Sequence, residues 1–468
     1  MAGSRAGHRC GHLALTPVDF FADVHLTDGP VLWFAWAAGA AGFGWLLWAR
    51  GRRWLLTAAA ALLLAAGAVA AVHWLLLYAF STLPESLPRE VLAWFVAVVF
   101  ALFLWVLRLG KLRQSSPQGS PPAGSPPAGR PAWRGRTAAT AAMLGVFLLA
   151  AVQINAYFGL NHTVSDVMGT AVARIQPLEA GLQRQPADAS PAALASWRAP
   201  EGMPAAGVLR KGVIPGTASG FSSREAYIYL PPAYQATPRP ALPVLVLFAG
   251  QPGSPSDWLT GGALRSRMDR FAQDHDGVAP VVVVVDPNGT ASANTLCMDS
   301  RIAKADTFLA VDVPRWIGQT LDVDPDHRQW AAGGFSFGAT CALQMGTRHP
   351  DVYASVLAFS SEREPALAKE RQKTIDAAFG GDVGAFDQQT PLAIMRETRF
   401  EGHAVYFGAG SRDPEFLAYM DELSAAARKA GFSVQAQPVA NTGHSWEAAS
   451  RGLPAALDFW AARWGIQP

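Results

Sequence analysis

Hydrophobic residues are distributed unevenly along the chain, and the distribution changes near residue 160. Before that point, four almost continuously apolar stretches approach or exceed the ~20 residues that a helix needs to cross a bilayer. None of the four contains an acidic residue or a lysine. The pattern therefore predicts four transmembrane helices, at 31–48, 55–80, 91–107 and 138–158.

Beyond residue 206, short apolar runs alternate with longer amphipathic segments. Several of the runs are continuous stretches of branched apolar residues, which is typical of central strands covered on both faces. The predicted strands are 226–230, 244–248, 281–285, 329–333, 355–359, 404–407 and 434–438. The predicted helices are 263–273, 305–320, 337–348, 415–430 and 447–464. This alternation predicts a mostly parallel sheet between helices, in one α/β domain at 207–468.

The remaining segments have no strong periodicity. We interpret 1–30 as an N-terminal tail and 159–206 as a stalk between the last membrane helix and the α/β domain. The stretch 114–131 is rich in Pro, Gly and Ser, so it cannot bury enough apolar surface to fold and is predicted to be a linker. The interval 362–401 interrupts the alternation of strands and helices and is long enough to form a cap beside an active site.

Basic residues are unequally shared among the connections of the apolar half. The first and third connections carry nearly all of them, whereas the second, 81–90, has Arg89 alone beside Glu85 and Glu90. The positive-inside rule therefore assigns the first and third connections to the cytoplasm. Four crossings would then leave both termini and the α/β domain outside, in a multi-pass protein of the cell membrane.

Composition limits the remaining possibilities. A chain of 468 residues is long enough for two or three structural units. The net charge of +2 argues neither for nor against a nucleic-acid partner, and none is predicted. Three cysteines are too few for a disulfide scaffold. Cys297 and Cys341 both fall in the predicted outer domain, so a disulfide between them is our hypothesis, with two buried thiols as the alternative.

The strongest chemical motif is the sequence Gly-Phe-Ser-Phe-Gly at 334–338, which follows an apolar strand and opens a helix. A serine on such a strand-to-helix turn is held in strained backbone geometry that exposes its hydroxyl above the sheet. Gly334 and Gly338 are needed because a Cβ at either position would collide across the turn. We therefore predict Ser336 as a nucleophile; the alternative is a glycine-rich turn that only packs.

A serine nucleophile needs a base, and in this fold the base is a histidine on a loop after the last strand. His444 lies there, whereas the other histidines of the domain follow no late strand. The third member should be an acid after the penultimate strand. Asp413 is the candidate, Glu415 is the second choice, and helix capping is the alternative role for Asp413. The order Ser336, Asp413, His444 is the one this fold uses.

An oxyanion hole needs two backbone N–H groups directed at the developing negative charge. One is expected from Phe337, the residue after the nucleophile. The other should come from the loop after the strand at 244–248, where Pro252 has no N–H, so Gln251 is the candidate. The sequence has no metal-ligand cluster, HExxH motif, Walker loop or dinucleotide fingerprint, so neither a metal nor a cofactor is predicted.

Three blocks in this order, at 307–317, 333–339 and 349–350, resemble the esterase D and secreted mycolyltransferase family of α/β hydrolases. The resemblance covers 207–465, and the chain resembles in particular actinobacterial esterases with several membrane spans before the hydrolase domain. It implies hydrolysis or transfer of an acyl ester through an acyl-serine, with Ser336, Asp413 and His444 at the triad positions. The acidic, sugar-binding stretch of mycolyltransferases is replaced here by Gln-Pro-Gly-Ser-Pro-Ser at 251–256, which speaks against trehalose mycolylation.

Together these features predict a membrane-anchored serine esterase that acts outside the cytoplasm on acyl or aminoacyl esters of envelope lipids. Its expected partners are this ester substrate and membrane lipid, and protein partners are left open. One alternative is an acyltransferase, which would use the same acyl-serine. Another is a non-catalytic protein that uses the hydrolase fold for binding. Transport or signalling by the spans is disfavoured because they contain almost no ionisable residues.

Overall fold

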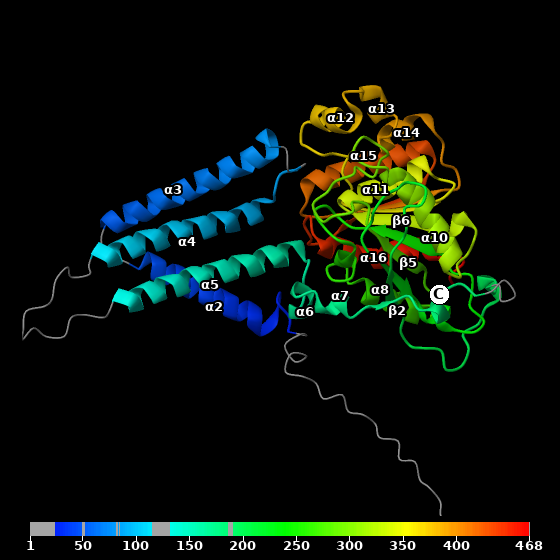
Figure 1. Ribbon diagram of the computed structural model, residues 1–468, viewed down its shortest axis with the longest axis horizontal. Helices are drawn as coiled ribbons and strands as arrows, with labels where there is room; N and C mark the ends of the chain where they lie inside the picture. The colour runs from blue at the N-terminus through cyan, green and yellow to red at the C-terminus, as the bar shows by residue number, and fades with distance from the viewer. Residues whose placement is uncertain are drawn as a thin grey trace, which may run out of the picture.

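A computed structural model of the chain describes residues 24–48, 52–80, 83, 85–114, 132–185 and 191–467. It contains a group of long helices and a larger mixed α/β body, which lie side by side in Figure 1. The predicted linker from residue 115 onward and the predicted tail up to residue 23 lie outside the described residues.

The first part consists of four long apolar helices, each long and apolar enough to cross a membrane. They are α2 (Gly29–Leu47), α3 (Arg52–Trp74), α4 (Arg89–Gln114) and α5 (Ala132–Phe158). A π-helical turn, Leu75–Ala79, extends α3 toward the α/β body. The four predicted membrane helices are thus present, with bounds that differ by a few residues because polar flanking residues continue the helical backbone.

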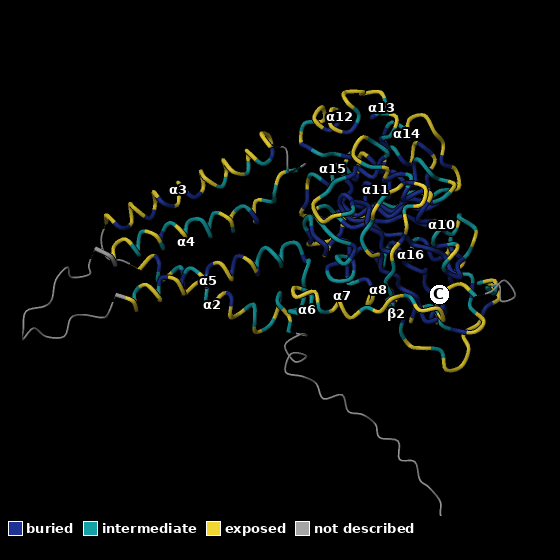
Figure 2. Tube along the Cα trace, in the orientation of Figure 1, coloured by how far each residue is buried: buried dark blue, intermediate teal, exposed yellow. Residues whose placement is uncertain are grey.

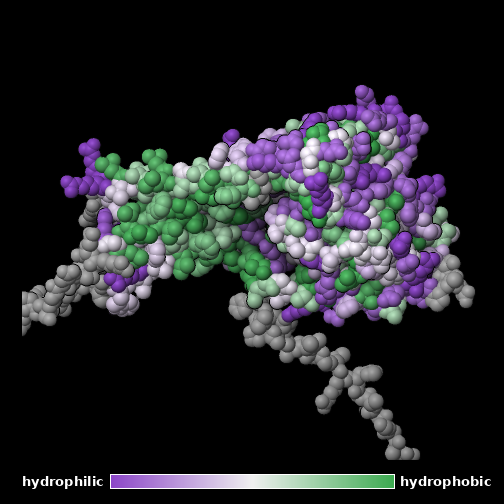
Figure 3. Space-filling view, turned by 45° about the horizontal axis from the view of Figure 1, so that its top comes forward, coloured by the Kyte–Doolittle hydropathy of each residue, from purple (hydrophilic) through white to green (hydrophobic). Residues whose placement is uncertain are grey.

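The outer faces of these helices carry large apolar side chains. Figure 3 shows a continuous hydrophobic surface over this part of the molecule and a mostly polar surface over the α/β body. Leu63 is 74% exposed and Trp33 is 73% exposed. Soluble proteins rarely expose apolar patches of this extent, so this surface fits a lipid environment.

Glycines allow α2 and α5 to approach closely. A Cβ added to Gly42 would lie 2.4 Å from the carbonyl oxygen of Ala142, and one added to Gly145 would lie 2.7 Å from the carbonyl oxygen of Ala38. Small residues at such crossings permit van der Waals packing between backbones, which is a main source of helix association in lipid.

The α/β body is built on a nine-stranded sheet with the order β1-β2-β3-β5-β4-β6-β7-β8-β9. Strand β3 is antiparallel to its neighbours β2 and β5, and the other neighbouring strands are parallel. The central strands are buried on both faces, which explains their continuous apolar sequences. The strands are β1 (Gln176–Pro177), β2 (Val208–Gly212), β3 (Ala226–Leu230), β4 (Val244–Phe248), β5 (Val281–Val285), β6 (Trp330–Phe335), β7 (Ser355–Phe359), β8 (Ala404–Gly410) and β9 (Ser433–Val439).

Helices cover both faces of the sheet and make a three-layer fold (Figure 1). Helices α8 (Leu264–Asp274) and α16 (Trp446–Ala461) pack together on one face. The other face carries α11 (Phe337–Arg348), α14 (Pro391–Glu397) and α15 (Pro414–Ala430). The predicted helix at 305–320 is divided into α9 (Ala305–Thr307), a π-helical turn (Phe308–Asp312) and α10 (Val313–Thr320). The predicted fold class is confirmed: an α/β hydrolase fold preceded by four long apolar helices.

Two segments differ in detail from the sequence-based expectation. Part of the region interpreted as a stalk packs on the α/β body, because β1 pairs with β2 and Trp197 is buried in the main core. The interval expected to form a cap contains α12 (Arg371–Phe379), α13 (Val383–Asp387) and α14. Helices α12 and α13 form the outer edge of the body at the top of Figure 1. Figure 2 shows that the buried residues concentrate around the sheet beneath them.

Candidate active site

The turn between β6 and α11 has the geometry expected of a nucleophile elbow. Ser336 lies at φ 56° and ψ −123°, a region that residues with a Cβ rarely adopt. A Cβ added to Gly334 would lie 2.1 Å from the Gly338 carbonyl, and one added to Gly338 would lie 2.2 Å from the Phe248 carbonyl oxygen. Both glycines are therefore sterically required, and the turn presents the Ser336 side chain at the carboxyl edge of the parallel strands.

His444 bridges the serine and the aspartate that the sequence singled out. Its Nε2 atom lies 2.9 Å from Ser336 Oγ, and its Nδ1 atom lies 3.1 Å from Asp413 Oδ2. The loops that carry the acid and the base are joined by the hydrogen bond from Arg412 N to the Thr442 carbonyl, at 2.9 Å. The structure thus brings together three side chains that are up to 108 residues apart in the sequence.

Two candidates for the acidic member of the triad, Asp413 and Glu415, differ in the contacts that their side chains make. Asp413 precedes α15, but its side chain makes no capping hydrogen bond there and instead faces His444. Glu415 makes an ion pair with Lys369 at 3.2 Å and accepts a hydrogen bond from the Tyr419 hydroxyl at 2.8 Å. Of the two candidates, Asp413 is therefore the one whose carboxylate contacts the imidazole ring within hydrogen-bond distance.

Aromatic rings enclose the imidazole of His444. The centroids of Phe416 and Phe335 lie 4.1 Å and 5.1 Å from that of the imidazole. Burial lowers the pKa of His444, but the nearby carboxylates of Glu85 and Asp413 more than offset this effect, so the pKa is raised above its ordinary value.

The predicted oxyanion-hole residues lie on the two segments expected. Gly250, on the loop after β4, is so close to the nucleophile that an added Cβ would lie 3.8 Å from Ser336 Cβ. Within the described residues, the backbone N–H groups of neighbouring Gln251 and of Phe337 make no hydrogen bond. Both groups therefore remain able to donate to an incoming oxygen atom.

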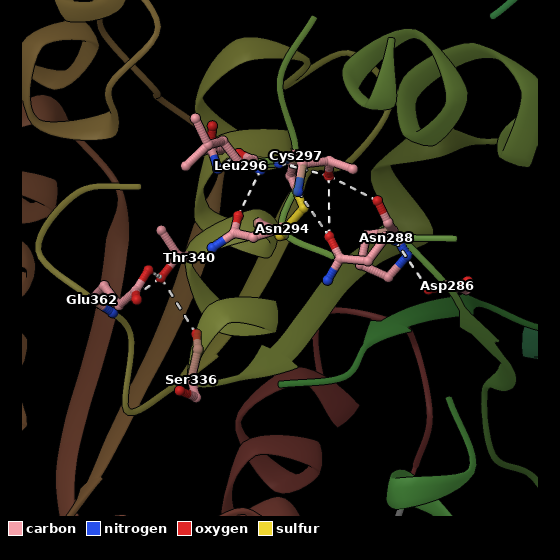
Figure 4. Close-up of a disulfide and its surroundings, with 12 residues drawn as sticks. Asp286, Asn288, Asn294, Leu296, Cys297, Ser336, Thr340 and Glu362 are labelled. Atoms are coloured by element: carbon pink, nitrogen blue, oxygen red, sulfur yellow. Dashed lines mark hydrogen bonds between the residues drawn. A yellow bond between two sulfur atoms is a disulfide. The ribbon is translucent and has the colours of Figure 1, made fainter. Parts of the chain in front are cut away.

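A disulfide supports the helix that follows the nucleophile (Figure 4). Cys297 and Cys341 are joined, which ties the loop after β5 to α11. On the same helix, Thr340 Oγ1 lies 3.3 Å from Glu362 Oε2, and it donates to the Ser336 carbonyl oxygen at 3.3 Å. Burial and the charge of Glu85 raise the pKa of Glu362 to about 8.

The part of the chain that contains the four long apolar helices also reaches this site. Glu85, in the connection between α3 and α4, has its Oε1 atom 3.7 Å from His444 Nε2. A Cβ added to Gly443 would lie 3.0 Å from the hydroxyl oxygen of Tyr157, near the end of α5. Sequence reasoning missed Glu85, which it used only as a negative charge in the connection 81–90. One feature of the sequence could have drawn attention to Glu85. It lies between prolines, in a connection that lacks the arginine clusters of the first and third connections.

The arrangement of sheet, elbow and Ser–His–Asp geometry defines the chain as an α/β hydrolase. The sequence profile of the family described as "Putative esterase" matches residues 221–459, just over half of the chain. The chain therefore belongs to this esterase family. Among the described residues, no three His, Cys, Asp or Glu side chains are grouped so that they could hold a metal ion.

An uncharacterized protein of Corynebacterium glutamicum is 40% identical over 255 residues, which cover 53% of this chain and 59% of that protein. The match thus spans less than two thirds of the length of that relative. Among solved structures, a ferulic acid esterase is 20% identical with a TM-score of 0.48, covering 55% of this chain and 99% of the other. Mycobacterium tuberculosis MPT51 is 18% identical with a TM-score of 0.43, covering 55% and 99% of the two chains.

Proposed function

We propose that this protein is a membrane-anchored serine esterase that acts outside the cytoplasm and hydrolyses acyl or aminoacyl esters of envelope lipids. The observation that carries the proposal is the continuous contact from Ser336 Oγ through His444 to Asp413, at 2.9 Å and 3.1 Å. These distances lie within the range for hydrogen bonds between a nucleophile, its base and the group that orients the base.

The reaction follows from this geometry. Ser336 Oγ attacks the ester carbonyl carbon while its proton passes to His444 Nε2, and the N–H groups of Phe337 and Gln251 bind the oxyanion. The carbon–oxygen bond to the alcohol then breaks, and His444 gives its proton to the departing alcohol oxygen. A water molecule then loses a proton to His444 and attacks the acyl carbon. The bond from that carbon to Ser336 Oγ breaks, His444 returns its proton to Oγ, and the acid is released.

The position of the site supports a substrate from the membrane. Ser336 and His444 lie at the edge of the sheet that faces the ends of the apolar helices, since Glu85 and Tyr157 both approach the histidine loop. A lipid ester at the membrane surface would therefore be close to the nucleophile.

A pocket of about 400 Å³ between α3 and α4 adds to this support. It is lined mainly by apolar side chains, and it extends to Ser86, the residue after Glu85. An acyl chain in this pocket would lie in an apolar environment, as hydrocarbon requires. Its ester end would point toward the connection that borders the active site.

Labelling with a membrane-impermeant fluorophosphonate probe tests the proposal. We expect intact cells that express the full chain to show labelling, and the Ser336→Ala variant to show none. Ser361→Ala is a matched control because Ser361 is buried nearby, lies on no strand-to-helix elbow, and should retain labelling. Labelling of lysates but not of intact cells would contradict the outward orientation, and labelling of neither would contradict the esterase activity.

A further inference from the structure

The connection between α3 and α4 places a carboxylate against the base of the active site. The Glu85 Oε1 atom lies 3.7 Å from His444 Nε2, while Nδ1 of the same ring faces Asp413. A carboxylate therefore lies near each of the two nitrogen atoms of the imidazole ring. One of them belongs to the α/β domain and the other to the membrane part of the chain.

The atom that Glu85 approaches is the one that moves protons. In the proposed mechanism, Nε2 takes the proton of Ser336 and later donates it to the departing alcohol. A negative charge near this nitrogen stabilises the imidazolium that exists between these two steps. At 3.7 Å the carboxylate lies beyond hydrogen-bond distance, so it attracts the cation without replacing Ser336 at 2.9 Å.

We propose that Glu85 is a positioning residue of the active site, supplied by the connection between two membrane helices, which acts through His444 to stabilise its cationic form. This inference rests on the proposed esterase function and extends it. The membrane region would then contribute to the chemistry as well as anchoring the enzyme. The α/β domain alone would have an incomplete site.

Hydrogen bonds hold described residues on both sides of Glu85. His73 Nε2, near the end of α3, accepts a hydrogen bond from the backbone N–H of Leu87 at 3.2 Å. Lys373, in α12, donates to the carbonyl oxygen of Tyr78 at 2.6 Å. One contact fixes the connection to its own helix and the other fixes the end of that helix to the outer edge of the α/β body.

Other charged and titratable groups around the Glu85–His444 pair determine how it titrates. Glu415 and Asp413 repel the carboxylate, whereas Lys369 attracts it. Burial is the largest influence on Glu85 and raises its pKa, while His444 opposes that rise. Among the described residues, Glu362, Tyr419 and Tyr157 also lie near the pair, and Glu90 and Arg412 act on Tyr157. A Glu85 variant leaves all of these side chains in place, and Glu362 responds to it directly because the charge of Glu85 raises the pKa of Glu362.

The pH dependence of fluorophosphonate inactivation tests the inference, with the full-length chain reconstituted in phosphatidylglycerol–phosphatidylcholine vesicles. In the wild type, the rate constant should fall at low pH as His444 becomes protonated. The Glu85→Gln variant keeps the shape of the side chain and loses its charge. We expect the low-pH fall of the rate constant, the acid limb of the profile, to occur about 0.5–1 pH unit lower in this variant, because the imidazolium of His444 is less stabilised. Its plateau rate should fall about 3- to 30-fold.

Two further variants make the result decisive. Glu90→Gln removes an exposed carboxylate at the start of α4 and should leave the profile unchanged. Glu85→Asp retains the charge and should keep the acid limb close to that of the wild type. An unchanged profile in Glu85→Gln would overturn the inference, as would equal loss of labelling in both Glu85 variants, since shape rather than charge would then matter. Absence of labelling in the wild type would instead overturn the proposed esterase function.

Discussion

The two halves of the molecule are both rich in apolar side chains, but they place them in opposite ways. In the α/β body, strands such as β5 (Val281–Val285) are fully enclosed by helices on both faces. In α3, Leu63 is 74% exposed, and similar side chains cover the outer surface of the helices (Figure 3). The body therefore has its own core, whereas the helices have an apolar exterior that needs lipid to cover it.

This difference shows where each half obtains its stability and precision. The body positions catalytic atoms through close packing and hydrogen bonds. A substitution that exchanges a single atom in the body should therefore have a large effect on activity. The helices depend on a broad apolar surface and on a few close crossings, so most of their residues should tolerate exchange for other apolar ones. Glu85 is where the two meet, because a connection of the membrane part reaches His444.

The largest effect should follow from a change of one atom in the body. Asp413→Asn keeps the size of the side chain but removes the charge that orients and stabilises His444. We expect kcat/KM for p-nitrophenyl butyrate to fall about 10³- to 10⁴-fold. Glu415→Gln is the matched control, since its carboxylate is engaged by Lys369 and Tyr419, and it should lose less than about tenfold. Similar losses in both variants would contradict the assignment of Asp413.

The contrast between the halves also explains what the sequence reveals. Continuous runs of apolar residues predicted β3, β4, β5 and β7 with correct bounds. Strands that are covered by other elements on both faces need apolar side chains at every position, and this gives an unambiguous pattern. Strands β1 and β2 were both missed, and in β1 the two residues, Gln176 and Pro177, carry no periodic signal. The local elbow at 334–338 and the expected order of a triad predicted Ser336, Asp413 and His444, and His444 lies within hydrogen-bond distance of both of the others. Glu85 had no such signal, because it approaches His444 only through the relative placement of two distant parts of the chain.

Loss of the disulfide should be the next largest effect and should be confined to the body. The bond closes a loop between cysteines 44 positions apart. Replacing both Cys297 and Cys341 by alanine should lower the free energy of unfolding by about 3–4 kcal/mol, because the unfolded chain gains freedom. Thermal denaturation of the full chain measures this change. A double variant that melts at the same temperature as the wild type would contradict the prediction.

A smaller effect should follow from a glycine at a crossing of membrane helices. Gly42 faces α5 so closely that a Cβ would lie 2.4 Å from the Ala142 carbonyl oxygen, whereas Gly44 has open space on the same helix. Gly42→Leu should lower stability in detergent micelles by about 2–3 kcal/mol, and Gly44→Leu should have little effect. If the two variants unfold at the same temperature, α2 and α5 do not depend on this close packing.

The smallest expected effect concerns Glu362, whose pKa of about 8 reflects burial and the charge of Glu85. A carboxyl group with a raised pKa stabilises the folded protein fully below its ordinary pKa. That contribution is lost as pH rises through about 8, because folding then requires a buried charge. Wild-type stability should therefore decrease between about pH 5 and pH 9.

Glu362→Gln should remove this dependence and make the variant more stable than the wild type at pH 9, by about 1–2 kcal/mol. Glu397→Gln, which changes an exposed carboxylate at the end of α14, is the control and should melt like the wild type at both pH values. The Glu85→Gln variant should give an intermediate result, since it removes one of the two influences that raise the pKa of Glu362. An unaltered profile in Glu85→Gln would mean that the membrane connection does not affect this carboxyl group electrostatically, and the two halves would then be more independent than their contacts indicate.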